Sequence, residues 1–286
     1  MARVTILGSS GYIGRHFAKS LENSSHLNLL SSKSINFFDI GSFQKNLERT
    51  QTKIMSSDYI FFLSSRSKFD TWNDKDLQIF IDNFKLFCSL YKNKQIIYLS
   101  STDVYGSIDK SLLPISEDTR VSPESFYGLS KVASERIILE IFDKKLIHIL
   151  RLPGIFGTNK KVLEFTKTGL GNKIVFCIKS NQPLELDNEN VLNLRRDWVN
   201  VNYVVSHFKQ LLKQFTPGLY NFTTGQSPTI QSWIYNFEEE FNCKLSLNFM
   251  SESKINSYDL VFDSRALLND FPDSFSDKLN FIGGNM

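Results

Sequence analysis

The 286-residue chain has few cysteines and histidines, and their spacing argues against two kinds of site. Its three cysteines, Cys88, Cys177 and Cys243, are far apart and form no C-x-x-C pair. Neither a disulfide framework nor a structural zinc site is expected, and a reducing compartment fits this cysteine usage. The four histidines are scattered without the spacing of metal ligands, so no metal site is predicted.

The sequence also lacks a strong charge of either sign and any long hydrophobic run. Its 33 basic and 30 acidic residues give a formal net charge of +3, so no nucleic-acid-binding surface is predicted. No stretch is long enough to span a bilayer, and the apolar residues 4–7 are too few for a signal peptide. With 41% hydrophobic residues and 25 phenylalanines, we expect a folded cytoplasmic enzyme that does not associate with membranes.

Short β-branched runs alternate with longer helical patterns in the first half of the chain. This alternation predicts an α/β fold in which helices cover both faces of a parallel sheet. The link between the second and third predicted strands is too short for a helix, so one crossover is expected to be abbreviated. The predicted strands are 3–8, 27–31, 35–38, 58–63, 95–100 and 145–151, and the predicted helices are 12–22, 42–50, 73–91 and 124–143.

After Arg151 the apolar runs become short and irregular. This change predicts a smaller second domain at the carboxyl edge of the sheet, where open α/β folds bind their ligands. We place the first domain at 1–156, with segments near 198–225 returning to it, and the second mostly at 157–286. The elements predicted here are strands 174–178 and 182–186, a helix near 201–214, a strand near 218–222 and a helix near 229–242.

Three glycines follow the first predicted strand. Gly8, Gly11 and Gly14 form G-x-x-G-x-x-G between that strand and the first predicted helix. Glycines let the backbone approach a pyrophosphate closely, and the N–H groups and dipole of the helix attract the anion. The pattern therefore predicts a dinucleotide site. The alternative is an incidental turn before a helix.

The end of the second predicted strand lacks the carboxylate that usually binds the ribose 2′-hydroxyl of NAD. Residues 23–38 contain no Asp or Glu, and Ser31, Ser32 and Lys33 stand where the acid is expected. Arg15 follows the last glycine of the loop. Hydroxyls and cations accept a 2′-phosphate, so NADP(H) is favoured and NAD(H) is the alternative. Both cations could instead be ordinary solvated charges.

A tyrosine and a lysine are spaced for one face of a helix. Tyr127 and Lys131 lie four residues apart in the predicted helix 124–143, so phenol and ammonium are neighbours. A lysine cation stabilises a phenolate, which is expected to lower the pKa of the tyrosine and suit it to proton transfer. Ser101 ends the fifth predicted strand, where its hydroxyl could bind the same substrate oxygen. A surface pair without chemistry is the alternative.

Together these motifs resemble the extended short-chain dehydrogenases/reductases, the branch of nucleotide-sugar epimerases, dehydratases and reductases. The resemblance covers roughly residues 3–242. The glycine loop and the Tyr/Lys pair are shared by the whole superfamily, and the S-x-x-V-Y-G and R-D-W elements indicate the extended branch. The matching segments are GSSGYIG (8–14), STDVYG (101–106), PESFYGLSK (123–131), LRLPGIFG (150–157), RDWVNV (196–201) and LYNFTTG (219–225).

The resemblance implies a Rossmann-type doubly wound parallel sheet with a smaller C-terminal substrate-binding domain. It implies that Ser101, Tyr127 and Lys131 are catalytic, and that Ser101, Thr102 and Arg196 contact a nucleotide-sugar substrate. A plain salt bridge is the alternative for Arg196. The implied cofactor-binding residues are Gly8, Gly11, Tyr12, Ile13, Gly14, Arg15, Ser32, Lys33, Asp39, Ile40, Leu63, Ser64, Asn83, Tyr127, Lys131 and Pro153.

The resemblance also implies a homodimer and a role in polysaccharide biosynthesis. The predicted helices 73–91 and 124–143 carry apolar stripes that could form the dimer interface. Alternatively, the same stripes could face the sheet of their own chain. The stripe residues are Leu77, Phe80, Ile81 and Phe84 in the first helix and Val132, Ile137, Ile138 and Ile141 in the second.

Departures from the family pattern narrow the predicted reaction. Thr102 and Asp103 replace the Asp-Glu pair of dehydratases, which argues against the elimination of water. Asn200 replaces the histidine usual in the R-D element. We therefore expect an NADPH-dependent reductase of a nucleotide-linked keto sugar. The alternatives are a nucleotide-sugar epimerase and a non-catalytic NADP-binding sensor or scaffold.

Overall fold

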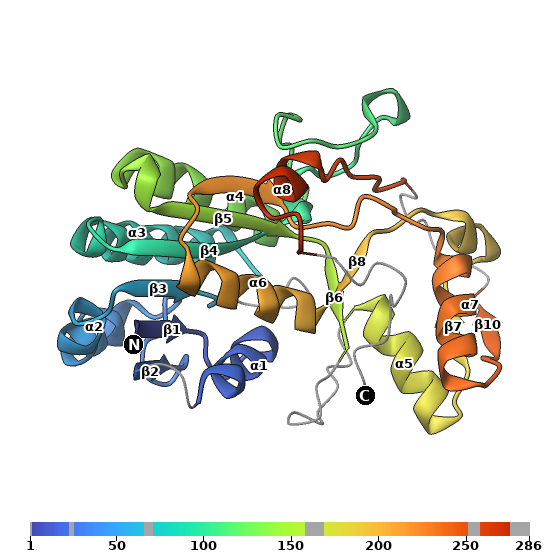
Figure 1. Cartoon of the computed structure of the whole chain (residues 1–286), viewed down its shortest axis with the longest axis horizontal. Helices are drawn as coiled ribbons and strands as arrows, with labels where there is room; N and C mark the ends of the chain where they lie inside the picture. Colours follow the sequence, from blue (N-terminus) through green and yellow to red (C-terminus); the bar gives the residue numbers. More distant parts are fainter. Residues whose placement is uncertain (1, 23–25, 66–70, 158–168, 251–257, 275–286) are drawn as a thin grey trace. The chain divides into compact units, whose positions relative to one another are not determined.

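The chain divides into two compact units, each assembled from separate stretches of sequence (Figure 1). Unit 1 comprises Met1–Gly106, Arg120–Arg151 and His207–Tyr220, and unit 2 comprises Ser107–Thr119, Leu152–Ser206 and Asn221–Met286. The computed structural model describes residues 2–22, 26–65, 71–157, 169–250 and 258–274. Within these ranges no helix combines the length and apolarity needed to cross a membrane.

Unit 1 is built on a six-stranded sheet, which confirms the predicted α/β fold. The strand order is β2-β1-β3-β4-β5-β9, so the order of the strands reverses at β1. Strand β1 pairs in parallel with both β2 and β3, and Leu7 lies opposite Leu30 and Phe62. The strands are β1 (Arg3–Leu7), β2 (His26–Leu30), β3 (Tyr59–Phe62), β4 (Gln95–Ser101), β5 (Ile147–Leu152) and β9 (Gly218–Asn221).

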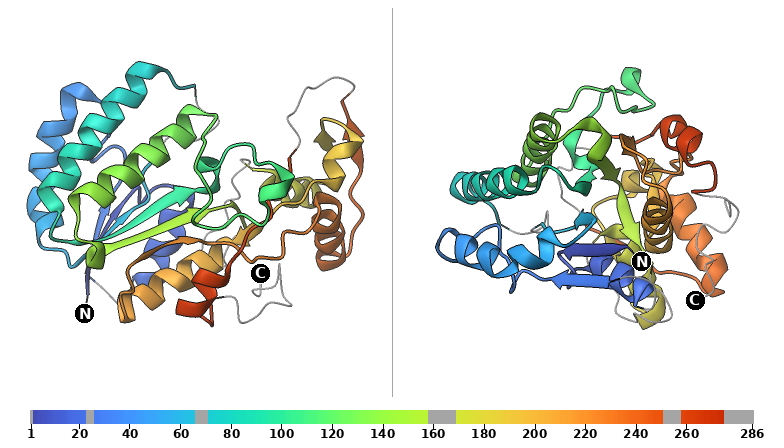
Figure 2. Two further views of the ribbon diagram at one scale, coloured as in Figure 1. Left: turned by 90° about the horizontal axis from the view of Figure 1, so that it is seen from above. Right: turned by 60° about the vertical axis from the view of Figure 1, so that its left-hand side comes forward.

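Helices cover both faces of this sheet (Figure 2). Successive strand residues point to opposite faces, and two phenylalanines of β3 show this directly. The Phe61 ring lies 4.6 Å from Phe17 and 5.0 Å from Phe208, whereas the Phe62 ring lies 4.8 Å from Phe84. One face is therefore covered by α1 and α6 and the other by α2, α3 and α4. These helices are α1 (Tyr12–Leu21), α2 (Ile40–Met55), α3 (Asp74–Tyr91), α4 (Phe126–Ile141) and α6 (Val201–Lys213).

The predicted strand 35–38 and the abbreviated crossover are both wrong, because β2 and β3 are joined through helix α2. Ile35 and Phe37 are buried like strand residues, which explains the apolar signal. The Asn36 side chain, however, accepts a hydrogen bond from the amide two residues on at 3.1 Å, and this local bond turns the backbone. Asp39 then caps helix α2.

The apolar stripes of α3 and α4 are mostly covered by the chain itself. Phe80, Phe84, Val132, Ile137 and Ile138 are all buried within the chain. All of these except Val132 belong to one core cluster that also contains residues of the sheet. The alternative that the stripes face the sheet is therefore correct for these residues.

Unit 2 has its own small core, centred on aromatic side chains. The rings of Trp198 and Trp233 lie 5.2 Å apart, and Phe156 packs against Trp233. Strands β6 (Gly154–Phe156) and β8 (Trp198–Asn200) pair in parallel, as do β7 (Leu184–Leu186) and β10 (Leu247–Phe249). The helices are α5 (Leu170–Ser180), α7 (Ile230–Phe241) and α8 (Arg265–Asp270).

The predicted strand 174–178 is wrong, because these residues lie inside helix α5. A short apolar run cannot by itself distinguish a buried strand from the buried face of a helix. The buried positions Gly171, Ile174 and Val175 have helical spacing, and Asn181 ends the helix in the left-handed conformation with a φ of 51°.

Candidate active site

The glycine loop brings the carboxyl ends of β1 and β3 together. Gly8 has a φ of 85°, in the left-handed region that favours glycine. A Cβ on Gly8 would lie 2.8 Å from both the Leu63 carbonyl carbon and the Ser64 amide nitrogen. A Cβ on Gly14 would lie 2.2 Å from the Gly8 carbonyl oxygen. Glycine is therefore required at these two positions because segments of the backbone approach each other closely.

The first turn of helix α1 follows directly from this loop. Gly11 is its N-cap residue and carries no side chain that could accept from the helix N–H groups. The turn, which includes Tyr12 and Ile13, contains no acidic residue, and the Arg15 amide begins the helical bonding at 2.9 Å from the Gly11 carbonyl oxygen. This arrangement favours an anion such as a pyrophosphate at the helix N-terminus.

The end of β2 is linked to the same loop through backbone hydrogen bonds. The Leu30 carbonyl oxygen accepts from the amides of Gly8 at 2.8 Å and Ser9 at 3.2 Å. Immediately after it, the exposed residues Ser32 and Lys33 form a turn. Ser32 and Lys33, the residues predicted to bind a 2′-phosphate, therefore follow directly on the strand end that is bonded to the glycine loop.

Asp39, Ile40 and Asn83, three predicted cofactor residues, come together at the start of helix α2. The Asp39 carboxylate accepts from the Gly41 amide at 2.9 Å, and hydrogen bonds from Ser42 lower the pKa of this carboxyl. Ile40 is exposed. The Asn83 side-chain amide, from α3, donates to the Phe37 carbonyl oxygen at 3.0 Å. In this structure Asn83 holds the loop that carries Asp39.

Ser101, Tyr127 and Lys131 converge from the end of β4 and the first turns of α4. The Ser101 side chain lies near the Tyr127 phenol and accepts from the Asp103 amide at 3.1 Å. The Lys131 ammonium donates to the Leu99 carbonyl oxygen at 2.7 Å and lies 5.4 Å from the centroid of the Tyr127 ring. On its other side lies the ring of Tyr98, at 5.1 Å. The sequence predicted this group, and the structure assembles it.

The pKa of Tyr127 is raised, whereas the sequence predicted that Lys131 would lower it. Burial raises the pKa of this phenol above its usual value, the charge of Asp103 raises it further, and the nearby Ser101 hydroxyl opposes the increase. Burial lowers the pKa of Lys131 to about 7, against the opposing effects of Glu135 and Asp103. Lys131 is therefore only partly charged at neutral pH, and burial has the larger effect on the pKa of Tyr127. The phenol keeps its proton and can donate it.

A buried ion pair, not found by sequence reasoning, lies behind this group. The Arg151 guanidinium binds the Glu135 carboxylate through two hydrogen bonds, of 3.1 and 2.7 Å. Arg151 also donates to the Tyr105 hydroxyl at 2.8 Å, and Ser100 donates to Glu135. A signal was available in the sequence, since Glu135 repeats the four-residue spacing from Lys131. Its partners, however, lie on other elements.

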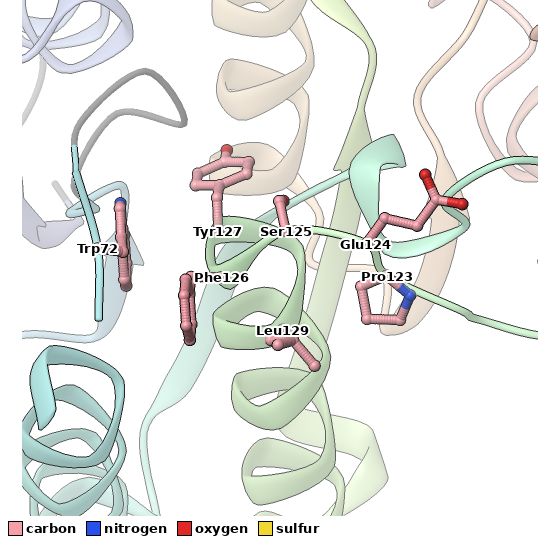
Figure 3. Close-up of a pocket in the computed structure, with 7 residues that line it drawn as sticks. All are labelled: Trp72, Pro123, Glu124, Ser125, Phe126, Tyr127 and Leu129. Atoms are coloured by element: carbon pink, nitrogen blue, oxygen red, sulfur yellow. The ribbon is translucent and has the colours of Figure 1, made fainter. Parts of the chain in front are cut away.

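A pocket of about 370 Å³ opens beside Tyr127 (Figure 3). In this view Trp72 and Phe126 stand on one side of the Tyr127 ring and Glu124 on the other, while Leu129 lies farther along helix α4. Aromatic faces together with a carboxylate suit the apolar and hydroxyl-bearing faces of a sugar ring. Trp72 and Phe126 were not among the predicted site residues.

The remaining predicted residues have structural contacts of their own. Thr102 is buried and begins the short 3₁₀ turn Thr102–Val104 after Ser101. Pro153 and Arg196 belong to unit 2, where Pro153 lies between β5 and β6. The Arg196 guanidinium donates to the Tyr258 carbonyl oxygen at 2.6 Å and lies over the Tyr258 ring. These contacts differ from the salt bridge considered for Arg196.

A parallel sheet with a glycine loop and a Ser/Tyr/Lys group at the carboxyl ends of its strands is the architecture of short-chain dehydrogenases/reductases. This chain belongs to the NAD dependent epimerase/dehydratase family, whose sequence model matches residues 4–222. Dehydratases, epimerases and reductases all share this architecture, so membership by itself leaves the reaction open.

Two curated relatives are reductases. The dTDP-4-dehydro-6-deoxyglucose reductase of Escherichia coli is 30% identical over 199 residues, which are 66% of this chain and 60% of that protein. The GDP-6-deoxy-D-mannose reductase of Pseudomonas aeruginosa is 29% identical over 151 residues, 48% of this chain and 46% of that protein. This chain therefore matches less than two thirds of the length of either relative.

A solved structure extends the likeness over nearly the whole fold. RMD from Pseudomonas aeruginosa, complexed with NADPH, matches with a TM-score of 0.74 and 19% sequence identity over 94% of this chain and 92% of that chain. At this level of identity, the match shows that the fold is shared.

Proposed function

We propose that this protein is an NADPH-dependent reductase of a nucleotide-linked keto sugar. The observation that carries the proposal is the geometry of the group, in which the Tyr127 phenol lies near Ser101 and the Lys131 ammonium lies 5.4 Å from the centroid of the Tyr127 ring. A reductase needs a proton donor at this position, and burial keeps the proton on the phenol. The names of two curated relatives support the same reaction class.

The residues around the glycine loop fit the proposed cofactor. The close backbone contacts at Gly8 and Gly14 hold the loop in place at the start of α1, where the pyrophosphate would bind. Ser32, Lys33 and Arg15 would hold the 2′-phosphate, and residues 26–38 offer no carboxylate to repel it. The NADPH in the related solved structure supports this choice over NADH.

Asp39 and Ile40 would lie at the adenine, and Asn83 would hold their loop in place. Leu63 and Ser64, which pack against Gly8, would line the ribose side of the cofactor. When bound, NADPH supplies the hydride that reduces the carbonyl carbon of the substrate.

The chain's own residues complete the reduction at the carbonyl oxygen. The Ser101 hydroxyl donates a hydrogen bond to that oxygen and draws electron density away from the carbon. Tyr127 transfers its phenolic proton to the same oxygen, so that the keto group becomes a hydroxyl. Protonated Lys131, 5.4 Å from the Tyr127 ring centroid, then stabilises the phenolate until it takes up a proton from solvent.

The pocket beside Tyr127 supports a sugar as the group that is reduced. Trp72 and Phe126 would pack on the apolar face of the ring, and Glu124 and Ser125 would bind its hydroxyls. We further propose that unit 2 binds the nucleotide portion of the substrate, with Arg196 at its pyrophosphate. In this proposal Thr102 contacts the sugar, and Pro153 lies near the cofactor.

We also propose that the protein acts in the cytoplasm, in polysaccharide biosynthesis, and as a homodimer. The odd number of cysteines and the modest net charge support the first of these points. The exposed leucines of α3 and α4, Leu90 and Leu139, support the last.

The experiment that tests the reaction uses purified protein, NADPH and a panel of nucleotide-linked 4-keto sugars, followed by loss of absorbance at 340 nm. The wild type should consume one NADPH per substrate. Tyr127→Phe removes the proton donor and should lower kcat by at least about a hundredfold, while the Kd for NADPH changes only a few-fold.

The same assay separates the alternatives. Interconversion of nucleotide sugars without net NADPH consumption would identify an epimerase. Binding of NADPH without turnover of any substrate would indicate a non-catalytic protein. Full activity of Tyr127→Phe would rule out the proposed proton transfer.

A further inference from the structure

Lys131 shares its surroundings with a second charged pair that the mechanism above does not use. Glu135 lies one helical turn farther along α4 and is only 4% exposed, and its partner Arg151, at the end of β5, is 5% exposed. A carboxylate buried this deeply is held by its hydrogen bonds, and here Arg151 and Ser100 provide them. The hydrogen bonds from Arg151 and Ser100 therefore hold the Glu135 carboxylate in one position.

The pair connects the elements that carry the active-site group. Along β4, the Leu99 carbonyl oxygen accepts from Lys131, and the next side chain, that of Ser100, donates to Glu135. Two consecutive residues of one strand, directly before Ser101, are therefore bound to helix α4. Through its bond to Tyr105, Arg151 also reaches the turn that follows Ser101.

We propose that Glu135 is a positioning residue for the reaction: held by Arg151 and Ser100, its negative charge keeps Lys131 protonated beside Tyr127. This proposal deepens the proposed reductase function and depends on it for its effect on turnover. Its electrostatic part depends only on the fold. Nothing in the comparisons assigns a role to Glu135 or Arg151.

The electrostatic argument follows from the groups that face Lys131. Glu135 from its own helix and Asp103 from the turn after β4 favour the ammonium, while burial between the Tyr98 and Tyr127 rings removes it from water. Arg151, a cation on β5, is held by its bonds to Glu135 and Tyr105 and is not among the charges that shift the pKa of Lys131. With Glu135 present, the pKa of Lys131 is about 7, so the ammonium is half-populated at neutral pH.

Removing the charge of Glu135 should move the pH dependence of the reaction to lower pH. A step that needs protonated Lys131 is lost as the pH rises through the pKa of Lys131. Glu135→Gln keeps the size of the side chain but removes its charge, so the pKa of Lys131 falls further and the loss begins at lower pH. If the pKa of Lys131 falls by one unit, the protonated fraction of Lys131 becomes about tenfold smaller at alkaline pH. Well below pH 6 this fraction changes little.

The test compares the wild type with Glu135→Gln, Glu135→Asp and Tyr105→Phe between pH 5.5 and 9. For Glu135→Gln, the alkaline limb of kcat/KM for the keto sugar should move down by about one pH unit. Glu135→Asp retains the charge and should restore the wild-type limb. Tyr105→Phe, the matched control, removes one hydrogen bond of Arg151 without changing any charge and should leave the limb in place. A Glu135→Gln profile lowered equally at every pH would overturn the proposal.

A second readout needs no substrate and separates this proposal from the reductase function. Lys131 is one of the predicted cofactor-binding residues. The affinity for NADPH, measured by quenching of protein fluorescence, should therefore weaken above pH 7, as Lys131 loses its proton. In Glu135→Gln the affinity should begin to weaken at a lower pH. This shift would support the role of Glu135 even if no keto sugar were reduced. An unchanged pH dependence of binding would contradict it.

Glu135→Gln leaves Arg151 without a buried counter-charge and could unfold the chain, so the wild-type protein provides a third measurement. Carboxyl ¹³C shifts of glutamate-labelled protein, with the Glu135 signal identified by its loss in Glu135→Asp, should show an ionised Glu135 from pH 5.5 to 9. A protonated carboxyl in this range would exclude the proposed electrostatic role.

Discussion

Gly8 and Gly14 are required by the glycine loop for different physical reasons. Gly8 adopts a left-handed backbone that other residues rarely accept. Gly14 has an ordinary helical backbone, and its position is set by contact, because any side chain would meet the Gly8 carbonyl oxygen. A substitution at Gly14 therefore tests close approach without adding backbone strain.

We predict that Gly14→Ala weakens NADPH binding at least about tenfold and destabilises the fold by roughly 1–3 kcal/mol, because helix and loop must separate to admit the methyl group. Fluorescence titration and urea unfolding measure these effects. Gly41→Ala is the matched control. Its Cβ would have its nearest neighbour at 3.7 Å, an ordinary contact, so stability should be unchanged or higher. Equal behaviour of the two variants would contradict the steric argument.

Residue identity predicts less where a side chain is bound by its own backbone. Asp39 was predicted at the adenine through resemblance, and the structure shows that it also caps helix α2. Arg196 likewise binds backbone carbonyl oxygens. Local hydrogen bonds of this kind depend on backbone conformation, which a residue type alone does not reveal.

At the scale of secondary-structure elements, two buried histidines join β5 to α6. His148 Nδ1 lies 2.6 Å from the Thr216 carbonyl oxygen, and His148 Nε2 lies 3.0 Å from His207 Nε2. Because a carbonyl oxygen only accepts, His148 carries its hydrogen on Nδ1 and accepts from His207 through Nε2. Both rings are neutral in this arrangement, and burial keeps the pKa of His207 well below 6.5.

We predict that acid destabilises the fold through this contact. The unfolded chain binds a proton at His207 near pH 6.5 and the folded chain does not, so the free energy of unfolding falls as the pH drops below about 6.5. At pH 5.5 the loss should be roughly 1 kcal/mol relative to pH 7.5, as measured by urea unfolding.

His207→Leu should reduce this pH dependence, whereas His26→Gln, at an exposed histidine, should leave it unchanged. Part of the dependence should remain, because burial also lowers the pKa of His16. An unaltered slope in His207→Leu would show that the contact does not control the acid response.

Helices and strands were predictable where apolar residues keep one period over many positions. Helices α1, α3 and α4 match their predicted ranges closely, because each is long and has one buried face. The errors fall on apolar runs of four or five residues, 35–38 and 174–178, which are too short to distinguish a period of two from one of 3.6. The side-chain hydrogen bond of Asn36 explains why 35–38 is not a strand. The helical spacing of the buried residues in α5 explains why 174–178 is not a strand.

At the scale of the whole molecule, the outer sides of α3 and α4 are the proposed dimer contact. Most of the stripe residues predicted for this contact are buried in the chain's own core, but Leu90 and Leu139 are 47% and 46% exposed. Exposed leucines on neighbouring helices suit a second copy of the chain.

We predict that Leu90→Asp combined with Leu139→Asp converts the dimer to a monomer, because two carboxylates would be buried at the interface. Light scattering coupled to size-exclusion chromatography measures the mass, and circular dichroism confirms the fold. Met55→Asp, at an exposed apolar residue of α2, is the control and should leave the mass unchanged. A monomeric wild type would refute the proposed dimer.

Features that depend on near neighbours in the chain were predictable from the residues alone. The glycine spacing at 8, 11 and 14 and the four-residue interval between Tyr127 and Lys131 each follow from one turn or one helix. For this reason the parallel α/β fold, the family and the grouping of Ser101, Tyr127 and Lys131 could be predicted, whereas Trp72, Phe126 and the Glu135–Arg151 pair could not.

The balance of charges in that site, by contrast, depends on packing between distant segments. Glu135, Arg151 and Ser100 lie on a helix and two strands that are distant in sequence, and only the strand order brings them together. The direction of the Tyr127 pKa likewise depends on how far packing excludes water. Burial and long-range contact are properties of the assembled sheet and its helices, and no local pattern of residues contains them.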